Sequence, residues 1–276
     1  MELFSTTLHQ AKAKVLLNKT EMQLIIFIVS VLIIGGFLLI AFRKKSQPLQ
    51  PDDDVKKEIL LQHVLFYQHL PEEEKMRFEK SIKTFLQKIR ITGIKTTVED
   101  VDKVFVAAAA IIPIFGFKDW EYRNIHEVLL YPASFDHEYK LEGEDRNILG
   151  MVGAGAMQNV MLLSQHDLRA GFLNHSDASN TAIHEFVHLV DQSDGYTDGV
   201  PETLLPHKYV LPFLKRIHEE IQKIQSGHSD INAYAATNEA EFLAVAAEYF
   251  FKQPEKMQEK HPVLYELLEQ VFMRKG

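Results

Sequence analysis

From residue 181 to residue 191 the chain reads Thr-Ala-Ile-His-Glu-Phe-Val-His-Leu-Val-Asp, which contains the pattern H-E-x-x-H. Residues four apart lie one above the other on a helix, so His184 and His188 can direct two imidazole nitrogens at one metal ion. Glu185 would then lie beside a metal-bound water and act as its general base. The pattern therefore predicts a helix that carries metal-assisted hydrolysis, with zinc as the metal suited to such ligands.

The flanking residues favour this helix. Asn180 is a good N-cap, and Ile183, Phe186, Val187 and Val190 give the helix an apolar face to bury. The alternative is a chance match of the pattern, in which the two histidines simply lie on a helix surface. That alternative predicts a purified domain without zinc.

Two histidines do not complete a zinc site, so a third ligand is needed. Asp194 stands where some H-E-x-x-H proteins carry a third histidine, but the glycine that turns the chain in those proteins is missing, which makes it a weak candidate. Farther along, Asn238 is a predicted N-cap, and Glu241 and Glu248 share the following helix face because they are seven residues apart. Glu239 points away from that face. Periodicity leaves Glu241 and Glu248 as alternative third ligands, and Glu241 also fits a capping box.

Asp191 follows His184 by seven residues and therefore lies on the same face of the predicted helix. It could orient an imidazole, as acids beside metal-bound histidines do. An exposed acid at the end of the helix is the alternative interpretation. The sequence leaves both open.

The rest of the chain predicts an α+β domain in which helices are in the majority and the sheet is small. Apolar residues recur every three or four positions over residues 55–70 and 71–91, which predicts two amphipathic helices. Residues 98–112 predict a small-residue helix that packs closely against its neighbours. Short apolar runs at 127–131 and 159–164 predict strands, and the second strand could offer its edge to an extended peptide.

An uncharged apolar run from residue 24 to residue 42 is long enough to span a bilayer as one helix. A cleaved signal peptide is the less favoured alternative, because the run is long and no small-residue cleavage site follows it. The cluster Arg43, Lys44 and Lys45 favours a cytoplasmic location for the residues after it. We therefore expect a single-pass membrane protein with a tail over 1–23, a transmembrane helix over 24–42, a linker over 43–54 and a cytoplasmic domain over 55–276.

The composition excludes several classes of protein. The 276 residues include no Cys, which excludes disulfide frameworks and thiolate zinc sites. Thirty basic residues against 38 acidic ones give a net charge of -8, which argues against a nucleic-acid partner. The glycine-rich stretch with Gly150, Gly153 and Gly155 is followed by neither of the common phosphate-binding patterns, so a bound nucleotide is not expected.

Two segments together carry a resemblance to a known family. The first is H-E-F-V-H-L-V-D at 184–191, and the second begins Y-A-A-T-N-E-A-E-F at residue 234. They resemble the zinc metallopeptidases typified by Mlc titration factor A, which are themselves similar to the catalytic domain of anthrax lethal factor. The likeness extends over about residues 60–270 and includes Leu-Pro-Glu-Glu at 70–73 and Val-Leu-Leu-Tyr-Pro at 128–132.

The resemblance implies a zincin-like fold and a peptidase that acts on peptides or proteins. It implies as zinc ligands His184, His188 and Glu241. It thereby selects Glu241 over Glu248. It also implies Glu185 as general base and Tyr234 as a donor to the developing oxyanion, whereas a tyrosine near a helix start is more often a packing residue.

Two features depart from related proteins. Thermolysin-like enzymes place an Asp four residues after the ligand Glu, and this chain has Val245 there, so support for the metal ligands must come from elsewhere. The expected membrane span is also foreign to the soluble family members. Because Mlc titration factor A takes its name from capturing a transcriptional repressor, the resemblance allows a second function: a membrane-held binding protein with a regulatory protein partner, in which zinc is mainly structural.

Overall fold

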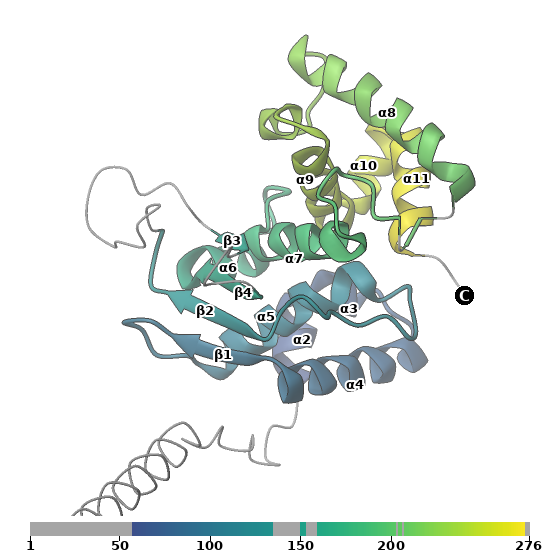
Figure 1. Ribbon diagram of the computed structural model, residues 1–276. Helices are drawn as coiled ribbons and strands as arrows, with labels where there is room; N and C mark the ends of the chain where they lie inside the picture. Colours follow the sequence, from purple (N-terminus) through teal and green to yellow (C-terminus); the bar gives the residue numbers. More distant parts are fainter. Residues whose placement is uncertain (1–56, 135–149, 153–158, 203, 206, 274–276) are drawn as a thin grey trace, which may run out of the picture. The chain divides into compact units, whose positions relative to one another are not determined.

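Four short strands form one mixed sheet in the computed structural model, which describes residues 57–134, 150–152, 159–202, 204–205 and 207–273 (Figure 1). The strands are β1 (Arg90–Gly93), β2 (Glu127–Tyr131), β3 (Gly150–Val152) and β4 (Val160–Ser164). Their order in the sheet is β1-β2-β4-β3. Neighbouring strands among β1, β2 and β4 are parallel, and β3 pairs with β4 in the antiparallel direction.

The two strands predicted from the sequence are confirmed as β2 and β4. The expectation that the strand at 159–164 offers its edge to a peptide is wrong, because β4 pairs with β2 on one side and with β3 on the other. The β3 pairing involves Met161, Leu162 and Leu163 of β4. The strand that lies outermost on this side of the sheet is β3.

Among the described residues, helices pack against the face of the sheet that carries Leu130 and Met161, and they dominate the second half of the chain. Those that precede β2 are α2 (Lys57–His63), α3 (Leu65–Gln68), α4 (Glu72–Lys88), α5 (Asp100–Ile111) and the 3-10 turn η1 (Ile112–Ile114). Those that follow β4 are α6 (Gln165–Leu173), α7 (Thr181–Asp191), η3 (Gln192–Asp194), α8 (His207–Gln225), η4 (Ala233–Ala236), α9 (Glu239–Lys252), α10 (Pro254–Lys260) and α11 (Pro262–Phe272). The predicted helix-rich α+β fold is confirmed.

The first helices differ from prediction at their ends. The single helix expected over 55–70 is interrupted at Val64, whose φ of -107° and ψ of 91° are extended and suit a β-branched residue. The helix expected over 71–91 is correct as α4 up to Lys88. Beyond it the prediction is wrong, because Ile89 adopts extended backbone angles and leads the chain into β1.

The small-residue helix expected over 98–112 is confirmed as α5. A capping box between Glu99 and Asp102 closes its first turn. The alanines 107–110 are fully buried, and their short side chains let α4, α6 and α7 approach α5 closely. This packing fixes α7 against the rest of the fold.

Helix α7 holds the two halves of the fold together. It contacts β3, α5 and α6 on the side of the sheet, and it packs along α9 on the other side (Figure 1). α9 is buried along most of its length and in turn contacts α8, α10 and α11. Side chains from α7 and α9 therefore meet in the interior of the molecule.

A buried histidine ties the C-terminal helices together. His261, between α10 and α11, places Nδ1 3.4 Å from Oε2 of Glu220 on α8 and Nε2 2.8 Å from Oδ1 of Asp230. The Glu220 carboxylate raises the pKa of His261, burial opposes this rise, and Asp230 adds to it. Burial alone would raise the pKa of Glu220, but His261 and Lys223 hold it at about 2.

Replacing His261 with Gln should lower the free energy of unfolding by about 2 kcal/mol at pH 6 and by less at pH 9. The folded-state pKa of His261 is raised, so its contribution is complete below the unfolded value of about 6.5 and is lost as the pH rises through the folded value. Urea unfolding at the two pH values measures the difference. Lys260→Gln is the control, because Lys260 also contacts Asp230 but carries no imidazole. An equal loss at both pH values would show that folding does not raise the pKa of His261.

Among the described residues, no helix has both the length and the apolar character needed to cross a bilayer. The span predicted over 24–42, the tail before it and the linker over 43–54 lie outside these residues. The described residues all belong to one compact unit of the chain.

Candidate metal centre

Helix α7 presents its two histidines to the same point. The Asn180 side chain caps the helix by accepting a hydrogen bond from the backbone N–H of Ile183, at 3.1 Å. One turn later, His184 and His188 place their Nε2 atoms 3.1 Å apart. The sequence predicted both the cap and the shared direction of the two imidazoles.

The third group comes from α9. Asn238 caps this helix by accepting from the backbone N–H of Glu241, at 2.9 Å. Oε2 of Glu241 lies 3.1 Å from Nε2 of His184 and 3.5 Å from Nε2 of His188. Three potential ligand atoms from two helices thus form a compact triangle.

This triangle fits a metal ion. In a tetrahedral zinc site with bonds of about 2.0–2.1 Å, two ligand atoms lie about 3.3 Å apart, close to the three separations seen here. Two imidazole nitrogens and one carboxylate oxygen suit zinc and also other first-row divalent ions. Among the residues that the structure describes, it is the one cluster of this kind with ligand atoms this close together.

Glu248, the alternative third ligand, contacts the opposite side of the same imidazole. Its Oε1 lies 2.7 Å from Nδ1 of His184, and its Oε2 accepts a hydrogen bond from the backbone N–H of Asn180. A carboxylate in this position fixes the orientation and tautomer of a metal-binding histidine. Thermolysin-like enzymes have an Asp at the position of Val245, and the sequence did not show which residue takes its place beside the histidines. In the structure, Glu248 is the carboxylate that contacts His184 from behind.

The surrounding acids perturb the pKa of His184. Burial alone would lower it, but Glu241 and Glu248 raise the pKa of His184 to about 10. In return, the two histidines hold the pKa of Glu241 well below its usual range, despite its partial burial. The centre is therefore rich in negative charge, which favours a bound cation.

Glu185 is almost completely buried beside the two histidines. Burial raises the pKa of Glu185 to about 7, although His184 and His188 act in the opposite direction. This value is close to the range that suits a group which accepts and returns a proton at neutral pH. Gly150 of β3 lies against this side chain: a Cβ at position 150 would be 2.7 Å from Cγ of Glu185 and 2.9 Å from Cγ2 of Thr181.

Tyr234 lies at the edge of the centre in η4. Its ring centroid is 6.1 Å from that of His184, and 54% of the residue is exposed. Partial burial and the carboxylates of Glu241 and Glu185 raise the pKa of Tyr234 above its ordinary value. Its hydroxyl therefore remains a hydrogen-bond donor at neutral pH.

Neither Asp191, the last residue of α7, nor Asp194 in η3 belongs to the cluster of three ligand atoms. Asp191 is fully buried, so the interpretation as an exposed acid is wrong. Its Oδ2 accepts from the backbone N–H of Gly199 at 2.9 Å, which anchors the following loop. Asp194 accepts from the backbone N–H groups of Tyr196 and Glu202, and it does not belong to the metal-binding cluster.

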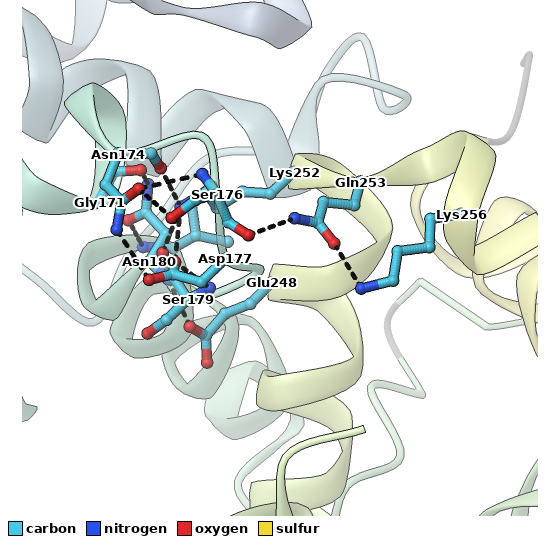
Figure 2. Close-up of polar contacts among 11 residues, drawn as sticks. Gly171, Asn174, Ser176, Asp177, Ser179, Asn180, Glu248, Lys252, Gln253 and Lys256 are labelled. Atoms are coloured by element: carbon cyan, nitrogen blue, oxygen red, sulfur yellow. Dashed lines mark hydrogen bonds and ion pairs between the residues drawn. The ribbon is translucent and has the colours of Figure 1, made fainter. Parts of the chain in front are cut away.

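A lysine on α9 holds the segment that leads into α7 (Figure 2). Lys252 is 9% exposed, and its Nζ donates to the carbonyl oxygens of Asn174 and Ser179 at 3.0 and 2.6 Å. It also lies 3.4 Å from Oδ1 of Asp177. Glu248, one turn earlier on α9, binds the next residue in the chain, Asn180. The two side chains thus fix the segment 174–180 against α9, and the sequence analysis did not identify this role of Lys252.

Replacing Lys252 with Met should lower the free energy of unfolding by about 1–3 kcal/mol, because the carbonyl groups of Asn174 and Ser179 lose the charged donor that a buried lysine supplies. Denaturant unfolding measures the loss. Lys256→Met is the matched control, since Lys256 is half exposed one turn farther along and its loss should change stability by less than about 0.5 kcal/mol. Equal effects of the two substitutions would contradict an anchoring role for Lys252.

The centre opens into a cavity of about 750 Å³. Its lining includes His184, Glu185 and Tyr234 beside the centre, and Ser176 and Asp177 from the segment held by Lys252. This volume accommodates several residues of a peptide or a ligand of similar size. The fold thus provides a cleft that is lined by Glu185 and by one of the three clustered residues, His184.

Comparisons with known proteins agree with this geometry. The family described as glucose-regulated metallo-peptidase M90 matches residues 40–273. Mlc titration factor A of Escherichia fergusonii is 31% identical over 216 residues, which cover 71% of this chain and 78% of that protein. Mlc titration factor A of Klebsiella pneumoniae is 28% identical over 217 residues, covering 72% and 78%. An uncharacterized protein of Synechocystis is 26% identical over 239 residues, covering 82% and 85%.

Proposed function

The chain belongs to the M90 family of metallopeptidases, and we propose that it is a zinc-dependent peptidase whose ligands are His184, His188 and Glu241. The observation that carries the proposal is the convergence of these three side chains next to a buried glutamate that lines a peptide-sized cavity. A zinc ion bound by these ligands would polarise the scissile carbonyl and acidify a water molecule.

The chain's own residues would perform the proton transfers. Glu185 accepts the proton of the attacking water and returns it to the leaving amine, for which a pKa of about 7 is suitable. Tyr234 donates a hydrogen bond to the oxygen of the scissile carbonyl as negative charge develops on it. Glu248 keeps His184 in the tautomer that leaves Nε2 free to bind the metal.

The substrate class follows from the cavity and from β3. The cavity takes an extended segment of a peptide or protein, and Gly150 of β3 lines it. A peptide that runs beside β3 would pass directly over Glu185. We therefore expect backbone pairing with β3 to align the scissile bond.

Metal analysis and a peptide-cleavage assay on the purified full chain test this function. We expect about one bound zinc per chain, cleavage of a mixed peptide library, loss of cleavage after chelation, and recovery on adding zinc. His184→Ala should bind no zinc. A protein that holds zinc firmly but cleaves nothing in the library would contradict the peptidase assignment.

Gly150→Ala should lower kcat/KM by about 10- to 100-fold while zinc stays bound, since the new methyl group must displace Glu185 or Thr181 and small misplacements of catalytic groups are costly. Met151→Ala is the control, because Met151 packs on the other face of the sheet against Tyr131, Val160 and Leu162. Unchanged kcat/KM in Gly150→Ala would show that the position of Glu185 has little influence on the reaction.

A second candidate function is capture of a protein partner. The name of the Mlc titration factor A relatives states that they titrate Mlc, which favours a regulatory binding role. In that case zinc would be mainly structural, and Glu185→Gln would leave partner binding unchanged. Co-purification of a repressor with a protein that shows no peptidase activity would support this function over the first.

We also propose that a transmembrane helix over 24–42 anchors the domain over 55–276 on the cytoplasmic side of the membrane. The length of the uncharged run and the basic cluster at 43–45 support the proposal. Resistance of the full chain to alkaline extraction from membranes tests the anchor. Protease digestion of intact cells and of inside-out vesicles tests the orientation. Cleavage of the domain in intact cells would show that the domain lies outside the cytoplasm.

A further inference from the structure

A second cavity, of about 380 Å³, lies between α4 and the segment over 111–122. It shares no lining residue with the cleft at the metal centre. Its walls are largely aromatic and aliphatic, with Phe85, Ile114, Phe117, Trp120 and Tyr122 among them. The volume falls within the range of small-ligand pockets, and the lining suits an apolar body.

Positive charge surrounds this cavity although the chain is acidic overall. Its lining holds four cationic side chains and a single carboxylate, that of Glu121. Arg77 binds Glu74 and the carbonyl oxygen of Phe115, and Lys88 binds Glu121. Among the described residues, neither Lys80 nor Lys118 has an ion pair, so both can bind an incoming anion.

The walls of the cavity are fixed by the packing of the metal-binding helix. Phe85 and Tyr122 both contact Phe186 of α7, with ring centroids 5.8 and 5.4 Å apart, and Tyr122 also donates to the carbonyl oxygen of Ala110 at 2.8 Å. Trp120 packs edge-on against Tyr122 with centroids 4.9 Å apart. The apolar floor is therefore held in place from behind and does not depend on a ligand for its shape.

We propose that this cavity binds a small amphiphilic anion, with an apolar body against the aromatic walls and one carboxylate between Lys80 and Lys118. Charge complementarity carries the choice of ligand: a neutral apolar molecule would leave both lysines unused, and a cation would be repelled by them. A multiply charged polar ligand such as a nucleotide would gain little from the largely apolar lining. The inference is independent of the proposed peptidase activity.

The single tryptophan of the chain reports on this site, because Trp120 lines the cavity. Octanoate, below its aggregation threshold, should change the tryptophan fluorescence of the purified full chain saturably. At equal chain length, 1-octanol should bind about tenfold more weakly and octylammonium more weakly still, since the lysines attract only the anion. Equal affinity for octanoate and octanol would overturn the anionic character of the site.

Variants separate the lysines from general surface charge. The double substitution of Lys80→Gln and Lys118→Gln should raise the dissociation constant for octanoate about tenfold. Each lysine charge is partly screened by solvent, so the loss of one should raise the dissociation constant roughly threefold. Lys83→Gln is the matched control, because Lys83 is exposed on the same helix, lies outside the cavity lining, and should leave the affinity unchanged. Both lysines of the pair are exposed, so the double variant should fold normally.

Three further outcomes would overturn the proposal. They are the absence of a saturable fluorescence change, an affinity unaffected by the double substitution, and binding of a short acidic peptide with an apolar side chain where octanoate does not bind. The last would assign the cavity to protein docking. Because none of these measurements uses peptide cleavage, their failure is distinguishable from failure of the peptidase function.

Discussion

Glu185→Gln should lower the proposed peptidase activity by about 10²- to 10⁴-fold, the range expected when a positioned general base is removed. The amide has nearly the same shape as the carboxylate, so it should fit the space between Gly150 and Thr181 without moving β3. It cannot accept the proton of the attacking water. The loss should therefore appear in kcat, with little change in KM.

Zinc should remain bound in this variant, because the carboxylate of Glu185 is not one of the three clustered ligand atoms. A measurement of the zinc affinity of the Glu185→Gln variant tests this expectation directly. Glu239→Gln is a suitable control. Glu239 lies in α9 two residues before Glu241, but its side chain pairs with His218 at the surface. Full activity in Glu185→Gln with zinc retained would remove Glu185 from the mechanism.

The sequence located α7 and the shared direction of its two histidines well, because both depend on local spacing. The H-E-x-x-H pattern and the N-cap Asn180 fix the directions of His184 and His188 within one helix, and no tertiary information is needed for that. The same spacing argument on α9 could narrow the third ligand only to Glu241 or Glu248. Both residues do lie on one face, and both reach His184.

What separates Glu241 from Glu248 is the crossing of α9 over α7, which no periodicity describes. Glu241 meets the Nε2 side of the His184 ring and Glu248 meets the Nδ1 side. The sequence treated the two acids as alternatives for one role, whereas the packing places them on opposite sides of the His184 ring. The resemblance to the family chose Glu241 as ligand but assigned nothing to Glu248.

The remaining omissions have the same origin in long-range contacts. Lys252 sits in a helical pattern that predicts only an exposed or half-exposed side chain, yet it binds a segment more than 70 residues earlier in the chain. β1 and β3 have four and three residues, too few to show an alternating pattern. For Gly150 the sequence indicated only that no phosphate-binding pattern follows it, and its contact with Glu185 becomes visible only when β3 is placed beside α7.

Glu241→Gln should weaken zinc binding far more than Glu248→Gln. Both substitutions remove one negative charge from the same helix at nearly the same distance from His184, so they form a matched pair. Loss of an outer partner such as Glu248 should cost about 10- to 100-fold in metal affinity. Loss of the ligand Glu241 should exceed this range, because two imidazoles alone do not complete a zinc site.

Competition with a chelating dye measures both affinities, and the unfolding of the two metal-free variants gives a second, independent contrast. Without metal, Glu248→Gln should be the less stable protein by about 1–3 kcal/mol, since Glu248 is buried and binds both His184 and the backbone of Asn180. Glu241 is more exposed, and its removal relieves the crowding of acids around Glu185. If Glu248→Gln lost zinc more completely than Glu241→Gln, the roles of ligand and supporting carboxylate would have to be exchanged. The two measurements together therefore distinguish a residue that binds the metal from one that holds the fold around it.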